Sequence, residues 1–385
     1  MKITIIANGL LYADNYPAPN QGGSVHTWNL CRELAKRGHE ITILRRGKSI
    51  TLVELGIKLV GVNFKGLESL FKFQSTPYHI GSYFSRIQFS KSAAEFLSKN
   101  RPDLIVLIDR FTCLIPLKLN IPSIYIMHSP DALEFFRNDA IHANPMNSIL
   151  YYIKNRVERH ILSNVDEIVV LDKSIKTYLR KLGLKSVTRI PNAIEINHFC
   201  EDTEDQNYVL YGGRLDWNKN VDSLVYEFAK LSRKFPDFKL KIVGSGPKQK
   251  DILKLISKCN LDSKIELHPE LPREKYLDFV KKCSFFVLPS KHETFSVSLI
   301  EAMSYGKPVL ARKNMGTKDI IKHNENGFIF STENEFGKYL SKLISDQNLR
   351  KEMGKRAKLS AMENFSLKKQ TDSYEILFQR IKEKN

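Results

Sequence analysis

Strand-sized apolar runs that alternate with longer helical segments restrict the fold of this chain more than any other feature of its sequence. The run KITIIA (2–7) precedes the helical segment SVHTWNLCRELAKRGH (24–39), and EITILR (40–45) follows it. A strand, a helix and a strand of these lengths form a β-α-β unit with parallel strands. Further apolar runs, typical of parallel strands buried on both faces, occupy 102–108, 122–129 and 165–172. The pattern predicts an open, doubly wound α/β sheet.

The same alternation begins again after a polar, turn-rich stretch at 191–207. Its strand-sized runs are YVLYGGR (208–214), FKLKIVGSG (238–246), KIELHP (264–269), SFFVLPS (284–290), PVLAR (308–312) and GFIFS (327–331). Because 385 residues exceed the size of one comfortable core, two domains are expected. We predict a first domain at 1–190, a linker at 191–207, a second domain at 208–365 and a closing helix at 366–385 that packs back toward the first domain.

The composition indicates a globular protein, and the cysteines indicate that it resides in the cytoplasm. It is 42% hydrophobic and 26% charged, which excludes a disordered or fibrous chain. Five Cys without a C-x-x-C pair indicate reduced thiols rather than disulfides or a zinc site. The longest apolar runs are strand-sized, so no membrane span is predicted. The opening MKITIIANGL fits a buried first strand better than a signal peptide.

The formal net charge of +18 favours anionic partners such as nucleotides, nucleic acid or an acidic membrane leaflet. An ordinary Lys-rich soluble surface explains the same excess equally well. No helix-turn-helix, zinc finger, ribonucleoprotein motif or aromatic-interleaved basic stripe is present, so we predict no nucleic-acid partner. The basic, aromatic segment 64–91 leaves two alternatives open, a peripheral contact with an anionic membrane and an ordinary helix-loop region.

Three glycine-rich turns come at strand ends, and basic residues stand beside one of them. The turns are PNQGGSVHT (19–27) with Gly22 and Gly23, YGGRLDWNKN (211–220) with Gly213, and VGSGP (243–247) with Gly244. Glycines at such positions let the backbone approach a ligand. Arg214 and Lys219 supply a planar fork and a point charge, which suit a diphosphate. Each turn alone is a weak signal, but together they predict a nucleotide diphosphate.

Two carboxylates, Glu293 and Glu301, stand with seven residues between them in HETFSVSLIEAMSYG (292–306). The strand SFFVLPS precedes them, so we expect Glu293 in a loop at the carboxyl edge of the sheet. Glu301 is then about two turns along a helix that ends at Gly306. In isolation this spacing also fits a loop acid and an ordinary surface helix residue. The basic residues predicted at the same sheet edge favour a ligand site.

The chain resembles the retaining glycosyltransferases of family 4, which have the two-domain GT-B fold. The resemblance rests on GGSVHTWNLCRELAKRGHEIT, IMHSP, IPNAIEINHF, YGGRLDWNKN, VGSGP and HETFSVSLIEAMSYGKPVLA, which occur in the family's order. It covers nearly the whole chain and is weakest at 50–99 and 131–154. It implies two Rossmann-like, doubly wound domains that face a central cleft, the first binding the acceptor and the second the nucleotide-sugar donor.

The resemblance also implies roles for single residues. Arg214 and Lys219 would hold the donor diphosphate and stabilise charge on the leaving nucleotide. Glu293 would contact the sugar hydroxyls and Glu301 the ribose hydroxyls. His128 would reach the sugar or phosphate from the first domain. The remaining donor-binding residues are Gly22, Gly23, Gly213, Gly244, Thr294, Phe295 and Ser296, with backbone N–H groups of the last two on phosphate.

The implied reaction needs neither a metal nor a cofactor. No D-x-D motif occurs, which fits an enzyme in which Arg and Lys take the place of a divalent cation. We expect a UDP-sugar donor, on the frequency of such donors in the family. The acceptor would be a saccharide or lipid-linked glycan in cell-surface polysaccharide or glycolipid synthesis. The sequence does not decide the donor sugar, the linkage or the oligomeric state.

Departures from the family pattern leave other functions open. Many relatives carry Gly where this chain has Thr294 and Ser296, and an acid that often follows the first glycine pair is replaced by Ser24-Val25. None of these changes removes a charged residue of the predicted site. The alternatives are a nucleotide-sugar epimerase of the same fold, which needs no acceptor, and a catalytically inactive nucleotide-binding relative.

Overall fold

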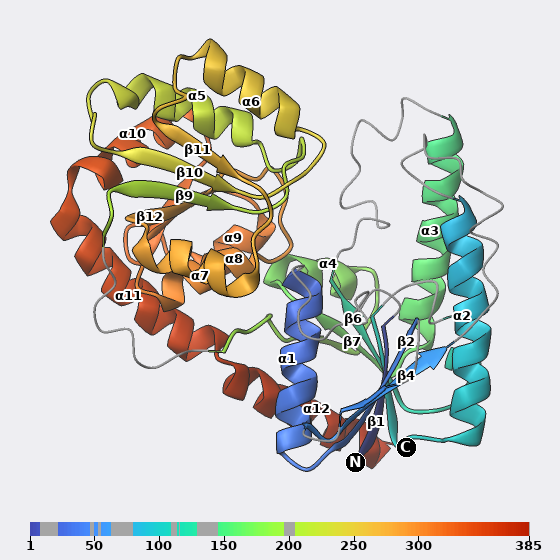
Figure 1. Cartoon of the computed structure of the whole chain (residues 1–385). Coiled ribbons are helices and arrows are strands. Elements are labelled where there is room, and N and C mark those ends of the chain that lie inside the picture. Colours follow the sequence, from blue (N-terminus) through green and yellow to red (C-terminus); the bar gives the residue numbers. More distant parts are fainter. Residues whose placement is uncertain are drawn as a thin grey trace. The chain divides into compact units, whose positions relative to one another are not determined.

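The chain forms two compact units in the computed structural model (Figure 1). The structure describes residues 1–7, 22–46, 50–52, 55–62, 80–108, 114, 116–128, 145–195 and 205–384. The first unit is Met1–Ile190 with Gln370–Asn385, and the second is Pro191–Lys369. These limits lie close to the predicted boundaries at 190 and 366. The stretch 191–207, predicted as a linker, falls within the second unit.

The first unit is built on a sheet whose described strands follow the order β3-β4-β2-β1-β5-β6-β7-β8. All neighbouring pairs are parallel except β3 with β4. The strands are β1 (Lys2–Ile6), β2 (Glu40–Arg46), β3 (Ile50–Leu52), β4 (Ile57–Val62), β5 (Leu104–Leu107), β6 (Ser123–Met127), β7 (Glu167–Val170) and β8 (Val187–Arg189). Strand β1 lies between β2 and β5, where the strand order reverses. Its central position explains why KITII is an almost continuous apolar run.

Helices cover both faces of this sheet, and each face has its own hydrophobic cluster. They are α1 (Gly22–Lys36), α2 (Ile80–Lys99), η3 (Pro116–Leu119), α3 (Pro145–Asn164), α4 (Lys173–Lys181) and α12 (Leu367–Lys384). Trp28 of α1 and Phe378 of α12 belong to one cluster. Phe89 of α2, Ile161 of α3 and Leu179 of α4 belong to the other. The doubly wound prediction is confirmed for this unit. Of the basic segment 64–91, residues 64–79 lie outside the described part of the chain.

The second unit repeats the architecture with a smaller sheet, whose described strands are all parallel in the order β11-β10-β9-β12-β13-β14. The strands are β9 (Tyr208–Gly212), β10 (Lys239–Val243), β11 (Ile265–His268), β12 (Phe285–Leu288), β13 (Val309–Arg312) and β14 (Gly327–Phe330). The helices are α5 (Val221–Ser232), α6 (Gln249–Lys258), α7 (Arg273–Lys282), α8 (Val297–Ser304), α9 (Met315–Ile320), α10 (Glu333–Ser345) and α11 (Gln347–Phe365). In Figure 1, α5 and α6 lie on one face of the sheet and α7 and α8 on the other.

The strand order of the second unit places the loops after β9 and β12 next to each other at the carboxyl edge of the sheet. Strands β9 and β12 are neighbours, and the chain leaves β9 toward β10 on one side and β12 toward β13 on the other. In open parallel sheets, such a reversal of strand order leaves a crevice outside the carboxyl ends of the strands. The predicted residues Arg214, Lys219 and Glu293 all follow these two strands. The second unit therefore presents its candidate site at this edge.

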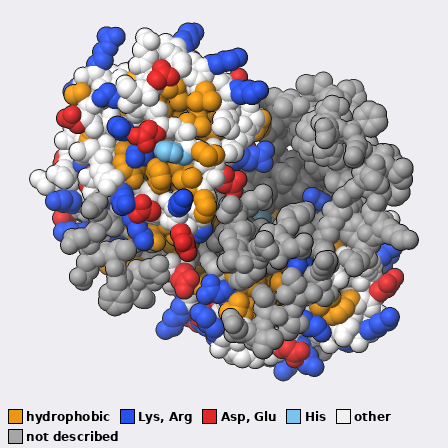
Figure 2. Space-filling model, in the orientation of Figure 1, with side chains coloured by type: hydrophobic (Ala, Val, Ile, Leu, Met, Phe, Trp, Pro, Cys, Tyr) orange, Lys and Arg blue, Asp and Glu red, His pale blue; other side chains and the backbone are white. Residues whose placement is uncertain are grey.

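Basic side chains are spread rather than gathered on the described part of the face in view in Figure 2. Figure 2 shows Lys and Arg interspersed with Asp and Glu on the described part of the face in view. On that face Lys and Arg are distributed as on an ordinary solvated surface.

None of the helices within the described ranges is long and apolar enough to cross a bilayer.

Candidate active site

The turns after β9 and β10 pack backbone against backbone, and their glycines make this contact possible. Gly213 donates its N–H to the Val243 carbonyl at 3.0 Å. A Cβ on Gly244 would lie only 1.9 Å from the Gly213 carbonyl oxygen, and Gly244 has a φ of +153°. Packing at the sheet edge therefore requires a glycine at 244, and Gly213 has a φ of +158°, which residues with side chains rarely adopt. Their direct contact with a ligand stays a prediction.

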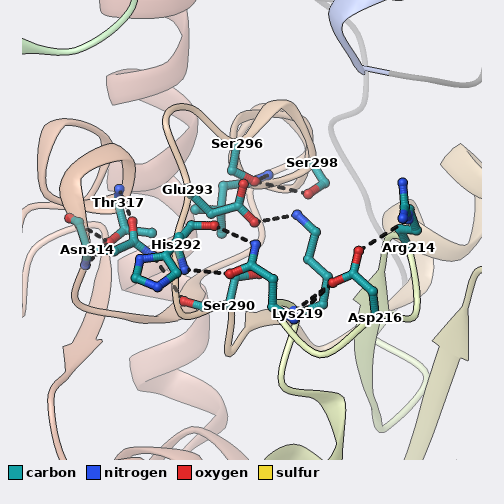
Figure 3. A network of polar contacts seen from close by, with 12 residues as sticks. Arg214, Asp216, Lys219, Ser290, His292, Glu293, Ser296, Ser298, Asn314 and Thr317 are labelled. Carbon is teal, nitrogen blue, oxygen red and sulfur yellow. Dashed lines mark hydrogen bonds and ion pairs between the residues drawn. The ribbon is translucent and has the colours of Figure 1, made fainter. Parts of the chain in front are cut away.

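Asp216 folds the loop that carries the two predicted basic residues (Figure 3). Its Oδ1 accepts the backbone N–H groups of Asn218 at 3.0 Å and Lys219 at 3.2 Å. Its Oδ2 lies 3.2 Å from Nε of Arg214, whose side chain is 71% exposed. The guanidinium is thus oriented by Asp216 while most of it faces solvent. The sequence prediction did not include Asp216, although an Asp in such a turn commonly bonds backbone N–H groups two residues on.

Lys219 and Glu293 meet as an ion pair between the loops after β9 and β12. Lys219 Nζ lies 2.5 Å from Glu293 Oε1, and the side chains are 22% and 11% exposed (Figure 3). Asn218 and His292 join the same two loops through a reciprocal pair of hydrogen bonds, each 3.0 Å long. The structure therefore brings together a lysine and a glutamate that lie far apart in the sequence. Low exposure strengthens their interaction relative to a surface pair.

Helix α8 begins at Val297, three residues beyond Thr294. Ser296 is the N-cap, and its hydroxyl accepts the Leu299 N–H. The first N–H groups of a helix lack intrahelical partners, and the helix dipole makes this end attractive to anions. The segment that includes Thr294 and Phe295 lies against the start of α9, where a Cβ on Gly316 would be 2.7 Å from the Thr294 carbonyl carbon. The sequence prediction had not included Gly316, which holds this segment close.

Glu301 lies on α8 and is buried, with 3% of its surface exposed. Its Oε1 forms an ion pair with the guanidinium of Arg273, at the first position of α7. Burial raises the pKa of Glu301 above the usual 4.5, although Arg273 opposes that shift. The alternative in which Glu301 is an ordinary exposed helix residue is therefore wrong. Arg273 had no role in the sequence prediction, because nothing in the chain signals a contact between these two helices.

The residues predicted from the first unit are placed only in part. His128 directly follows β6, and burial lowers the pKa of its imidazole to about 4. The ring is therefore neutral near pH 7, so any contact that it makes with a ligand would be a hydrogen bond rather than a charge interaction. Gly22 and Gly23 form the beginning of α1 rather than a loop. The participation of these three residues in the donor site stays a prediction.

No group of three or more His, Cys, Asp or Glu is placed to hold a metal ion in the parts of the chain that the structure describes. The candidate site contains the charged side chains of Arg214, Asp216, Lys219 and Glu293, and Arg273 pairs with the buried Glu301 of α8. Such a set suits a ligand with a diphosphate and several hydroxyl groups.

Two family models match the chain in succession. The one described as "Glycosyltransferase Family 4" matches residues 20–198. The one described as "Glycosyl transferases group 1" matches residues 194–360. A similar protein is an uncharacterized glycosyltransferase of Haemophilus influenzae, 25% identical over 353 residues, which covers 89% of this chain and 91% of the relative.

Solved structures share the fold over the full length. Sucrose-phosphate synthase from Thermosynechococcus elongatus superposes with a TM-score of 0.82 at 19% identity, covering all of both chains. Anabaena HepE, solved with UDP-glucose, has a TM-score of 0.72 at 16% identity. The match covers 99% of this chain and all of the HepE chain. These likenesses establish the GT-B fold predicted from the sequence.

Proposed function

Because the chain belongs to the group 1 glycosyltransferases of family 4, we propose that it transfers a sugar from a nucleotide-diphosphate sugar to an acceptor hydroxyl. The acceptor is a saccharide or a lipid-linked glycan, and the anomeric configuration of the sugar is retained. The observation that carries this proposal is the Lys219–Glu293 ion pair between the β9 and β12 loops, beside the start of α8. A lysine, an exposed arginine and a helix N-terminus favour a diphosphate there, while a carboxylate next to them favours sugar hydroxyls.

In the proposed reaction the bond between the anomeric carbon and the diphosphate breaks, and negative charge grows on the departing nucleotide. Arg214 and Lys219 stabilise that charge, and the N–H groups at the start of α8 add to it. Glu293 accepts hydrogen bonds from the sugar hydroxyls and orients the ring. The acceptor oxygen attacks from the face that the nucleotide leaves, and a phosphate oxygen takes the acceptor proton. No separate catalytic base and no divalent cation are needed.

We favour UDP as the leaving nucleotide. Support comes from HepE, a protein with the same fold that was solved with UDP-glucose. We place the reaction in the cytoplasm or at the inner face of the cytoplasmic membrane, in the synthesis of a cell-surface polysaccharide or glycolipid. The net positive charge supports an anionic donor and is compatible with an anionic membrane surface.

The test is a transfer assay with UDP-glucose, UDP-galactose and UDP-N-acetylglucosamine in the presence of EDTA, with a panel of saccharide acceptors. The expected result is release of UDP that depends on the acceptor, and a product with the anomeric configuration of the donor by proton NMR. Release of an epimerised nucleotide sugar without acceptor would identify the epimerase alternative. Inversion of the anomeric centre would contradict the retaining mechanism.

A further inference from the structure

Tyr276 of α7 reaches the carboxyl edge of the second sheet because Gly212, the last residue of β9, has no side chain. A Cβ on Gly212 would lie 2.5 Å from Cε2 of Tyr276, 2.6 Å from its hydroxyl oxygen and 2.9 Å from Cζ. The phenol end of this side chain therefore occupies the space over the strand end. The next residues, Gly213 and Arg214, begin the loop of the proposed diphosphate site.

The hydroxyl group of Tyr276 is buried, and it makes no hydrogen bond within the described part of the chain, although the residue as a whole is partly exposed. Buried hydroxyl groups in folded proteins are nearly always paired, because an unpaired one costs stability. An exception at the edge of a ligand site needs an explanation. A ligand hydroxyl that enters the site would supply the missing partner.

The charged neighbours of Tyr276 indicate which ligand group that is. Burial and then the nearby Glu301 carboxylate raise the pKa of Tyr276 well above its ordinary range, so the hydroxyl keeps its proton. Arg273, one turn before Tyr276 on α7, pairs with the same carboxylate. An ionised carboxylate can only accept hydrogen bonds, whereas the tyrosine hydroxyl can donate one. A ligand O–H that donates to Glu301 can accept from Tyr276 at the same time.

We propose that Tyr276 is a specificity-determining residue for the nucleoside half of the donor, and that its hydroxyl donates a hydrogen bond to a ribose hydroxyl which itself donates to Glu301. This inference rests on the proposed function and on the contact between Glu301 and the ribose hydroxyls that the family resemblance implies. Gly212 leaves room for the ring, and the ion pair with Arg273 holds Glu301 in place. A deoxyribonucleotide leaves both Tyr276 and Glu301 without their partner, and sites built on buried hydrogen-bonding groups reject such analogues strongly.

The test measures dissociation constants by calorimetry for UDP, GDP, ADP and CDP and for their 2′-deoxy and 3′-deoxy forms. The proteins are the wild type, Tyr276→Phe and Tyr226→Phe, whose tyrosine is exposed on α5. We expect the wild type to prefer one ribonucleotide over a deoxy form by about tenfold or more. Tyr276→Phe should bind that ribonucleotide about tenfold more weakly and discriminate less. Tyr226→Phe should match the wild type.

Thermal unfolding without ligand separates this role from a structural one. Removing an unpaired buried hydroxyl should leave the melting temperature of Tyr276→Phe unchanged or raise it. Equal binding and equal discrimination by Tyr276→Phe and the wild type would overturn the inference and leave the proposed function intact. Failure of the wild type to bind any of the nucleoside diphosphates would overturn both.

Discussion

Lys219 and Glu293 form a mostly buried ion pair whose two members have different tasks in the proposed reaction. The lysine is assigned to the departing diphosphate and the glutamate to the sugar. Each neutralises the other, with 2.5 Å between Nζ and Oε1. A donor that enters must share these groups, so the pair is both a structural contact and a preorganised site.

Replacement of Lys219 by Ala should reduce turnover by about 10²–10³-fold, the usual effect of removing one group that stabilises developing charge. It should also lower the melting temperature, because the largely buried Glu293 then loses its counter-charge. The matched control is Lys248→Ala, which removes a surface pair with Asp222 of 2.9 Å. Turnover of Lys219→Ala equal to that of the control would contradict the assignment.

His128 should make the stability of the protein depend on pH between about 6.5 and 4. Burial lowers its pKa to about 4 from an ordinary value of 6.5, so the unfolded chain takes up a proton before the folded one does. Stability is therefore complete above pH 6.5 and decreases as the pH falls toward 4. Urea unfolding at pH 7 and pH 5 should show a smaller difference for His128→Asn than for the wild type. His160→Asn, which changes an exposed residue of α3, is the control and should retain the full difference.

At the residue scale, the sequence predicts several residues of the candidate site but not the contacts that those residues make. Spacing and loop chemistry indicated Glu293, Lys219 and Arg214, because each follows a recognisable strand. The burial of Glu301 and its pairing with Arg273 depend on how α7 packs beside α8, and no local pattern encodes that. Asp216 differs in that its contacts fold the loop, and motifs for ligand binding do not indicate such a residue.

At the scale of elements, the site depends on close packing between turns. The turns after β9 and β10 touch at Gly213 and Gly244, and Gly316 lets the Glu293 segment approach α9. These contacts hold the loops after β9 and β12 in place without a ligand. Glycines that the sequence analysis assigned to ligand approach are thus also needed for the architecture of the sheet edge.

Replacement of Gly244 by Ala should lower the free energy of unfolding by about 2–3 kcal/mol, since a Cβ cannot stand 1.9 Å from the Gly213 carbonyl oxygen. Chemical denaturation gives this quantity. Gly183→Ala is the control, because Gly183 also has a positive φ, of +87°, but no atom lies within 4 Å of the added Cβ. Equal losses in the two variants would mean that backbone conformation, and not the contact between turns, makes Gly244 necessary.

Element prediction succeeded where the apolar pattern was strong. The strands β9 to β14 all lie within their predicted runs. No element was predicted over 333–365, where α10 and α11 lie. Small residues such as Gly354, Ala357 and Ala361 form much of the buried side of α11, so its apolar stripe is faint. Gly354 is required there, because a Cβ would lie 2.0 Å from the Gly306 carbonyl oxygen.

At the scale of the whole molecule, the end of the chain completes the core of the first unit. Helix α12 contributes Tyr374, Leu377 and Phe378 to the cluster that contains β1 and α1. Arg37 at the end of α1 reaches Asp372 and Glu375 at 2.6 and 2.7 Å. Length and amphipathicity allowed a prediction of two domains and a returning helix. Strand order and register follow from side-chain packing across the sheet, which the one-dimensional pattern does not contain.

Leu377→Ala should destabilise the first unit by about 2–5 kcal/mol, the range found when a buried leucine is truncated. Its neighbour Ile376 is 68% exposed and provides the control, for which little change is expected. Urea unfolding followed by circular dichroism measures both variants. A similar stability of the two variants would show that α12 is not part of this core.

The central claim is that the carboxyl edge of the second sheet binds a nucleoside diphosphate through positively charged side chains. The most direct test is the melting temperature of the wild type, Arg214→Ala and Lys248→Ala with UDP, GDP, ADP or CDP, in EDTA and in magnesium. A ligand that binds the folded state raises the melting temperature. We predict that one nucleotide stabilises the wild type and Lys248→Ala in EDTA and stabilises Arg214→Ala much less. No shift with any nucleotide, or an equal shift in Arg214→Ala, would contradict the claim.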